Sequence, residues 1–119
     1  MNKLSITILL FVLFIFQINA STFKNPILKG GYPDPSICEN NGNYYLVNSS
    51  FEYFPGLPLH RSKDLVNWEL VGYALDRGSQ VSSKVNLIDV QSNGGIHAPS
   101  IRCHGDKFYI ISTNVYYDQ

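Results

Sequence analysis

The chain has 119 residues and a formal net charge of zero, with nine Lys or Arg residues balanced by nine Asp or Glu residues. It contains no run of Lys or Arg, which argues against nucleic acid and acidic membrane surfaces as partners. A chain of this length forms at most one domain.

The N-terminus has the pattern of a secretory signal peptide. The first three residues carry one positive charge, residues 4–16 are almost wholly apolar, and residues 18–20 (INA) supply the small-residue end of a cleavage site. We therefore expect residues 1–20 to be removed and the mature part, residues 21–119, to be secreted or periplasmic. An uncleaved anchor or a lipoprotein is the alternative, but no Cys follows directly to carry a lipid and the apolar stretch is short for a membrane span.

The first candidate for a working residue is Asp34, which stands between Pro33 and Pro35 in the segment GYPDPSI. Proline fixes its own φ and pushes the residue before it towards extended conformations, so this carboxylate has little backbone freedom. A carboxylate that is held in place suits catalysis. The alternative is a turn residue that caps a neighbouring N–H group.

A supersecondary unit starts twice in this chain. Residues 35–37 (PSI) and 44–47 (YYLV) recur at an offset of 64 as residues 99–101 (PSI) and 108–111 (FYII). Each copy is predicted to form a short strand after a proline, a polar turn and a second strand rich in aromatic and β-branched residues. The abundant Tyr and Phe residues of the whole chain suit strand packing, and they equally suit a site that stacks on sugar rings.

The segment between the copies adds two more predicted strands, residues 57–61 and 68–75, and then a loop over residues 76–94, in which residues 85–90 could form a brief strand or turn. No helical stripe of apolar residues follows the apolar N-terminus, so the mature chain is expected to be nearly all β. Repeated four-stranded units are typical of a β-propeller, although two similar hairpins in a sandwich remain the alternative. The chain would supply one blade and the first two strands of the next.

Cys38 and Cys103 are the two cysteines, and export would permit a disulfide between them. Two cysteines without other support are more often free or paired elsewhere than part of a disulfide framework. Residues 48–50 (NSS) form a glycosylation sequon, which matters only in a eukaryotic source.

Five segments resemble the start of glycoside hydrolase family 43, in particular its β-xylosidase and α-L-arabinofuranosidase branch. They are residues 25–30 (NPILKG), 32–37 (YPDPSI), 50–56 (SFEYFPG), 62–68 (SKDLVNW) and 94–99 (GGIHAP). The resemblance covers essentially all of residues 25–119, in order. It implies a five-bladed all-β propeller in the full-length parent, of which this chain would be an N-terminal fragment.

The resemblance also implies an activity. Enzymes of this family hydrolyse glycosidic bonds with inversion, using an Asp general base, a Glu general acid and a second Asp that tunes the acid. Asp34 matches the base, and the other two carboxylates would lie beyond residue 119. We expect the parent to act on terminal xylosyl or arabinosyl units of plant polysaccharide fragments, and the 119 residues alone to be inactive. A sugar-binding propeller without catalysis and a truncated product without function are the alternatives.

Two further positions carry over to the sugar site. Phe51 matches an aromatic residue that lines the pocket for the terminal sugar, with a core residue at a strand end as the alternative. His97 stands where the family usually has Trp, and Ser100 where it often has Asp. If position 97 faces the sugar, the chain has exchanged a broad stacking surface for a smaller, titratable ring.

Other polar residues are interpreted as structural. Asp64 is predicted to cap the turn between the third and fourth strands, and Trp68 to pack between blades. Glu52 is not taken as the missing acid, because alternation along a strand would point it away from Phe51. The His and Cys residues share no metal-ligand spacing, so no metal is expected from this segment, and no cofactor is implied.

Overall fold

The computed structural model describes residues 22–81 and 90–115. The predicted signal peptide, the predicted cleavage point before Ser21 and most of the segment at residues 85–90 lie outside the described residues. Apart from one short 3-10 turn, η1 (Gly78–Gln80), all regular structure here is β. Among these residues, no helix is long and apolar enough to cross a membrane.

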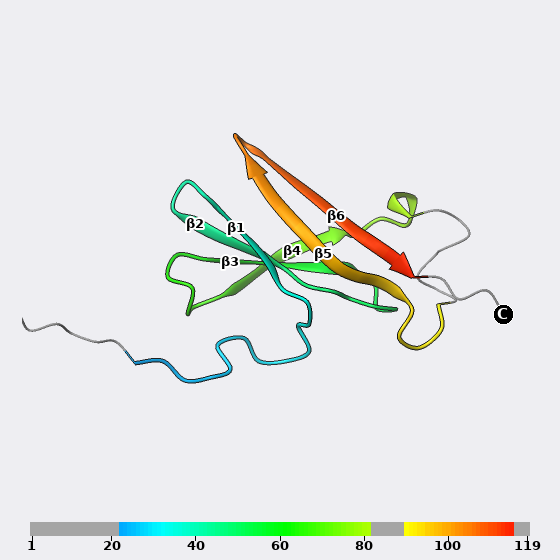
Figure 1. Ribbon diagram of the computed structural model, residues 1–119, viewed down its shortest axis with the longest axis horizontal. Coiled ribbons are helices and arrows are strands. Elements are labelled where there is room, and N and C mark those ends of the chain that lie inside the picture. Colours follow the sequence, from blue (N-terminus) through cyan, green and yellow to red (C-terminus); the bar gives the residue numbers. More distant parts are fainter. Residues whose placement is uncertain (1–21, 82–89, 116–119) are drawn as a thin grey trace, which may run out of the picture.

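The first four strands form one antiparallel sheet in the order β1-β2-β3-β4. They are β1 (Ser36–Asn40), β2 (Asn43–Val47), β3 (Gly56–Ser62) and β4 (Glu69–Leu75). A second sheet consists of β5 (Gly95–His104) paired with β6 (Lys107–Val115). Figure 1 shows this second hairpin, in orange and red, lying across the first sheet, and β5 contacts β1.

The two hairpins repeat in register as well as in sequence. Ser36 pairs with Val47 in the first hairpin, and Ser100 pairs with Ile111 in the second, so both partners are displaced by 64 residues. The first hairpin turns through Asn41 and Gly42, both with positive φ, the geometry that Asn-Gly favours in two-residue hairpin loops. The predicted repeat of one supersecondary unit is therefore confirmed at the level of residue pairs.

The core lies between the two sheets. Val47 and Leu57 from the first sheet and Ile96 and Ile101 from the second are at most 3% exposed. Burial of this kind stabilises by about 25 cal/mol for each Å² of apolar surface removed from water. Large apolar side chains on β4 and β6, such as Tyr73 and Ile111, remain exposed, as expected of blades whose other faces pack on neighbouring blades.

A disulfide joins the two sheets, and it settles the question that the sequence left open. Cys38 on β1 is bonded to Cys103 on β5, with 5.9 Å between their Cα atoms. Asn40 Nδ2 also donates to the carbonyl of Gly105, and the N–H of Ile101 donates to Ser36 Oγ. The pairing arises because β1 and β5 lie side by side, which the spacing of two cysteines in a sequence does not reveal.

Candidate active site

Asp34 occupies the loop before β1 and is exposed. Its φ is 51°, so it adopts the left-handed region rather than the extended conformation predicted from the proline that follows. This conformation is uncommon for residues other than glycine, although Asp and Asn tolerate it best. Hydrogen bonds from the segment after β2 hold the loop in this shape, and they outweigh the local preference set by Pro35.

Asn48 and Ser49 supply those bonds. Asn48 Nδ2 donates to the carbonyls of Tyr32 and Pro33 at 2.8 and 3.2 Å, and the N–H of Ser49 donates to the Pro33 carbonyl at 3.1 Å. Asn48 is 1% exposed, so the sequon at residues 48–50 is closed to a glycan in the folded chain. Three bonds to consecutive carbonyls therefore fix the backbone immediately before Asp34.

The carboxylate itself is also held. Ser49 Oγ donates a hydrogen bond of 2.6 Å to Asp34 Oδ2 and accepts one of 2.7 Å from the N–H of Ala98. Ser49 is 2% exposed. Sequence reasoning missed this residue, because in the sequence it stands out only as the middle residue of a sequon. The bonds connect the loop of Asp34 to β5 of the second sheet.

Phe51 and His97 come together at the same junction. Their rings meet edge to face with 4.6 Å between centroids, and both side chains are half-buried. The backbone of Phe51 pairs with that of Ile96 through two hydrogen bonds of 3.0 Å, which brings His97 alongside. His97 Nε2 lies 2.9 Å from the carbonyl oxygen of Asn93. The structure thus brings the predicted aromatic pair to the segments that hold Asp34.

A cavity of about 650 Å³ lies on the Phe51 side of this junction, and neither Asp34 nor His97 is among its lining residues. Its lining includes the consecutive residues Ser49 and Ser50 and a set of aromatic and proline side chains: Tyr32, Pro33, Phe51, Tyr53, Phe54, Pro55, Pro58 and Tyr73. The ring of Tyr32 stands edge-on to His60, a buried side chain whose pKa is lowered because burial disfavours the charged form. A largely apolar hollow, joined to the Asp34 carboxylate through its lining residue Ser49, can accept a ligand with flat apolar faces and hydroxyl edges.

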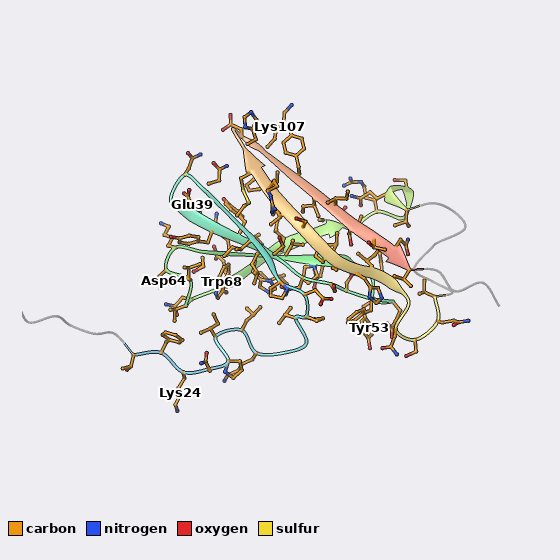
Figure 2. All side chains as sticks on the ribbon, viewed as in Figure 1. Lys24, Glu39, Tyr53, Asp64, Trp68 and Lys107 are labelled. Carbon is orange, nitrogen blue, oxygen red and sulfur yellow. A yellow bond between two sulfur atoms is a disulfide. The ribbon has the colours of Figure 1, made fainter. Side chains whose placement is uncertain are left out.

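Asp64 has the structural role predicted for it. Its carboxylate accepts hydrogen bonds from the N–H groups of Asn67 and Val66, from the Asn67 side chain and from Ser62 Oγ. These bonds, led by those from Asn67, hold the pKa of the carboxyl well below its usual range. Figure 2 shows Asp64 and Trp68 at one end of the first sheet and Tyr53 at the other. Asp64 therefore lies away from the candidate site.

Trp68 and Glu52 are placed by contacts that differ from the expected ones. The indole N–H of Trp68 donates to the Leu65 carbonyl, and its ring lines a cavity together with Pro26 and Ile27 of the N-terminal segment. Packing between blades stays a prediction for Trp68.

Glu52 lies in a turn closed by a hydrogen bond from the N–H of Tyr53 to the carbonyl of Ser50, so strand alternation does not determine the direction of its side chain.

In residues 22–81 and 90–115, no three His, Cys, Asp or Glu side chains gather in a way that could hold a metal ion.

A four-stranded antiparallel meander that restarts in register is the repeated unit of a β-propeller, and the fixed carboxylate of Asp34 lies just before the first strand of this unit. The model of the glycosyl hydrolases family 43 matches residues 23–119. The chain belongs to this family. It thus comprises one blade and the first two strands of the next, as the sequence predicted.

Relatives with curated names agree with this membership. The chain is 46% identical over 118 residues to a non-reducing end α-L-arabinofuranosidase of Bacteroides ovatus, covering 96% of this chain and 22% of the relative. It is 48% identical over 91 residues to a β-xylosidase of Bacillus subtilis, covering 76% of this chain and 16% of the relative. The chain therefore spans about a fifth of the length of these relatives.

Solved structures agree as well. A xyloglucan-locus family 43 protein of Bacteroides ovatus matches with a TM-score of 0.72 and 49% identity, covering 81% of this chain and 18% of that chain. A xylan β-1,4-xylosidase from Bacillus halodurans matches with a TM-score of 0.73 and 41% identity over the same shares. The arrangement of the two sheets is thus that of family members with known structures.

Proposed function

We propose that the whole protein containing this segment is an inverting glycoside hydrolase and that Asp34 is its general base. The observation that carries the proposal is the Asp34 carboxylate, which is exposed and yet held through Oδ2 by a buried hydroxyl. An inverting enzyme needs such a base to deprotonate the water that attacks the anomeric carbon, while a carboxylic acid about 6.5–9.5 Å away protonates the leaving oxygen. The resemblance places that acid beyond residue 119.

The proposed substrates are terminal xylosyl or arabinosyl units of plant polysaccharide fragments. Both sugars occur in the names of the relatives, which include an arabinofuranosidase and a β-xylosidase. The aromatic lining of the cavity that contains Phe51 and Ser49 supports a sugar ligand, because pyranose and furanose rings present apolar faces that stack on aromatic rings. Phe51 is proposed to contact the terminal sugar, and the His97 ring packs edge to face against the ring of Phe51.

The experiment that tests this proposal is an assay of the whole protein on aryl β-xyloside and aryl α-L-arabinofuranoside. Hydrolysis of either substrate with inversion of the anomeric centre supports the proposal. Binding of xylo- or arabino-oligosaccharides without any turnover would contradict it, and would favour a propeller that binds sugars without catalysis.

Exchange of His97 for Trp is expected to change sugar preference. His97 packs edge-on against Phe51 with 4.6 Å between ring centroids, and Phe51 lines the cavity, so a larger ring at position 97 is expected to displace Phe51 and change the shape of the cavity. We expect His97→Trp to change the ratio of kcat/KM for the two aryl glycosides by about 10-fold, the size of effect that small changes in pocket shape produce. An unchanged ratio, measured side by side with the wild type, would place position 97 outside the sugar pocket.

We also propose that the protein is exported and that its mature N-terminus is Ser21. The disulfide between Cys38 and Cys103 supports this, because disulfides persist in secreted and periplasmic proteins and are rare in the cytosol. Mass spectrometry of the exported protein is expected to find Ser21 as its first residue. Detection of Met1 on that protein would show that the segment is retained.

A further inference from the structure

The buried hydroxyl of Ser49 lies between the Asp34 carboxylate and the second sheet. We propose that Ser49 is a positioning residue: it holds Asp34 through Oδ2, so that Oδ1 is left to accept the proton of the attacking water. The inference rests on the proposed role of Asp34 as general base. Among the described residues, the hydrogen bond from Ser49 is the one that reaches the Asp34 carboxylate.

The direction of this hydrogen bond is determined by the second partner of Ser49. The N–H of Ala98 points at Ser49 Oγ from 2.7 Å and occupies one of its lone pairs, so Oγ is the acceptor there. The hydroxyl proton of Ser49 is then directed to Asp34 Oδ2, at 2.6 Å. Hydrogen bonds to an ionised carboxylate are shorter and roughly twice as strong as those between neutral groups.

A bulge in β5 makes the N–H of Ala98 available for this contact. His97 pairs with Thr113 and Ser100 pairs with Ile111, so Ala98 and Pro99 together face a single residue of β6. Ala98 has a φ of 42°, and its N–H donates to Ser49 of the other sheet rather than to β6. Bulges commonly redirect backbone or side-chain groups next to active sites. Pro99 is tolerated in the bulge because the ladder of hydrogen bonds is interrupted there and needs no N–H from this residue.

The mechanical consequence is that the carboxylate is oriented by both sheets at once. Backbone bonds from Asn48 and Ser49 fix the loop before Asp34, and the Ser49 hydroxyl, fixed in turn by Ala98, selects one carboxylate oxygen. Without the hydroxyl, the carboxyl group can rotate and either oxygen can turn away from the water. A displacement of about 1 Å at a reacting group can cost on the order of 100-fold in rate.

Ser62, at the end of β3, offers a matched control. It is also buried, at 3% exposed, and its Oγ accepts hydrogen bonds from the N–H groups of Asp64 and Leu65 at 3.1 and 3.0 Å. Its hydroxyl donates to the Asp64 carboxylate rather than to Asp34, and it does not line the cavity that contains Phe51. Ser49→Ala and Ser62→Ala therefore each remove one buried hydroxyl that joins a carboxylate to backbone N–H, but only the first should affect Asp34.

The test measures kcat, KM and thermal unfolding of the whole protein for Ser49→Ala, Ser49→Thr, Ser62→Ala, Asp34→Ala and the double variant Asp34→Ala/Ser49→Ala. We expect Ser49→Ala to lower kcat by about 10- to 100-fold with little change in KM, because the Ser49 hydroxyl is bonded to Asp34 and to Ala98 and therefore acts on the geometry of the base. Ser49→Thr, which keeps Oγ, should recover most of the lost rate. Ser62→Ala should lower the unfolding midpoint and leave kcat close to that of the wild type.

The double variant separates positioning from general structural damage. If Ser49 acts through Asp34, its removal should cost nothing further once Asp34 is absent. Equal losses of kcat in Ser49→Ala and Ser62→Ala, or a further loss in the double variant, would overturn the positioning role while the role of Asp34 stands. Full activity of Asp34→Ala would instead overturn the proposed function itself.

Discussion

Asp34→Ala is expected to lower kcat of the whole protein by about 10²- to 10⁴-fold, the range typical for loss of a general acid or base. The carboxylate is exposed, and its one hydrogen bond among the described residues comes from Ser49, so its removal leaves the apolar core intact. The loss should appear in kcat and kcat/KM on both aryl glycosides, with the unfolding midpoint close to that of the wild type. Retained hydrolysis would rule out Asp34 as the base.

Glu52→Ala is the control for this experiment. Glu52 is an acidic residue beside Phe51, and it lies in the turn closed by Tyr53 and Ser50. Its removal deletes a negative charge from the same end of the sheet without touching the loop before β1. We expect wild-type kcat for this variant, which would show that the loss in Asp34→Ala does not follow from a general change of charge.

Gly95→Ala is expected to be strongly destabilising. Gly95 begins β5 with a φ of 88°, and a Cβ at this position would lie 2.1 Å from the carbonyl oxygen of Phe51. The backbone of Phe51 would have to move away, which breaks the pair of hydrogen bonds between Phe51 and Ile96. Left-handed strain costs roughly 1–2 kcal/mol, and each lost hydrogen bond about 1 kcal/mol or more.

The total expected for Gly95→Ala is about 4–5 kcal/mol of unfolding free energy, since displacement of the buried Ile96 adds to these terms. Denaturant or thermal unfolding of the whole protein measures it. Gly78→Ala is the control, because a Cβ at Gly78 meets no atom within 4 Å, and its unfolding free energy should stay within about 0.5 kcal/mol of the wild type. A Gly95→Ala variant with the same unfolding free energy as the wild type would show that β5 can shift away from Phe51 without loss of stability.

The sequence predicted the strands and their repetition well, because these depend on local patterns. Alternating apolar residues and an Asn-Gly turn define the first hairpin, and the same pattern 64 residues later gives the same pairing. One boundary differs by more than a residue or two: β5 begins at Gly95 rather than after Pro99, since a bulge lets the strand continue through the proline. A proline therefore did not mark the start of this strand.

The candidate site was predicted only in part. The two flanking prolines indicated Asp34, and the resemblance to glycoside hydrolase family 43 added Phe51 and His97. The left-handed φ of Asp34, the hydroxyl of Ser49 and the close approach of Gly95 to Phe51 all depend on how the second sheet meets the first. Contacts between residues 49 and 98 cannot be inferred from local propensity, since they arise from tertiary packing.

The bond between Cys38 and Cys103 has a consequence for how the chain responds to proteases. The exposed Arg77 lies two residues after the end of β4, and a cut after it falls inside the loop that the disulfide closes. The two products would stay covalently joined, with β1 to β4 on one piece and β5 and β6 on the other. A nicked molecule would therefore carry Ser49 and Ala98 on different pieces, which the disulfide still holds near one another. On a denaturing gel it would separate into two bands only after reduction of the disulfide.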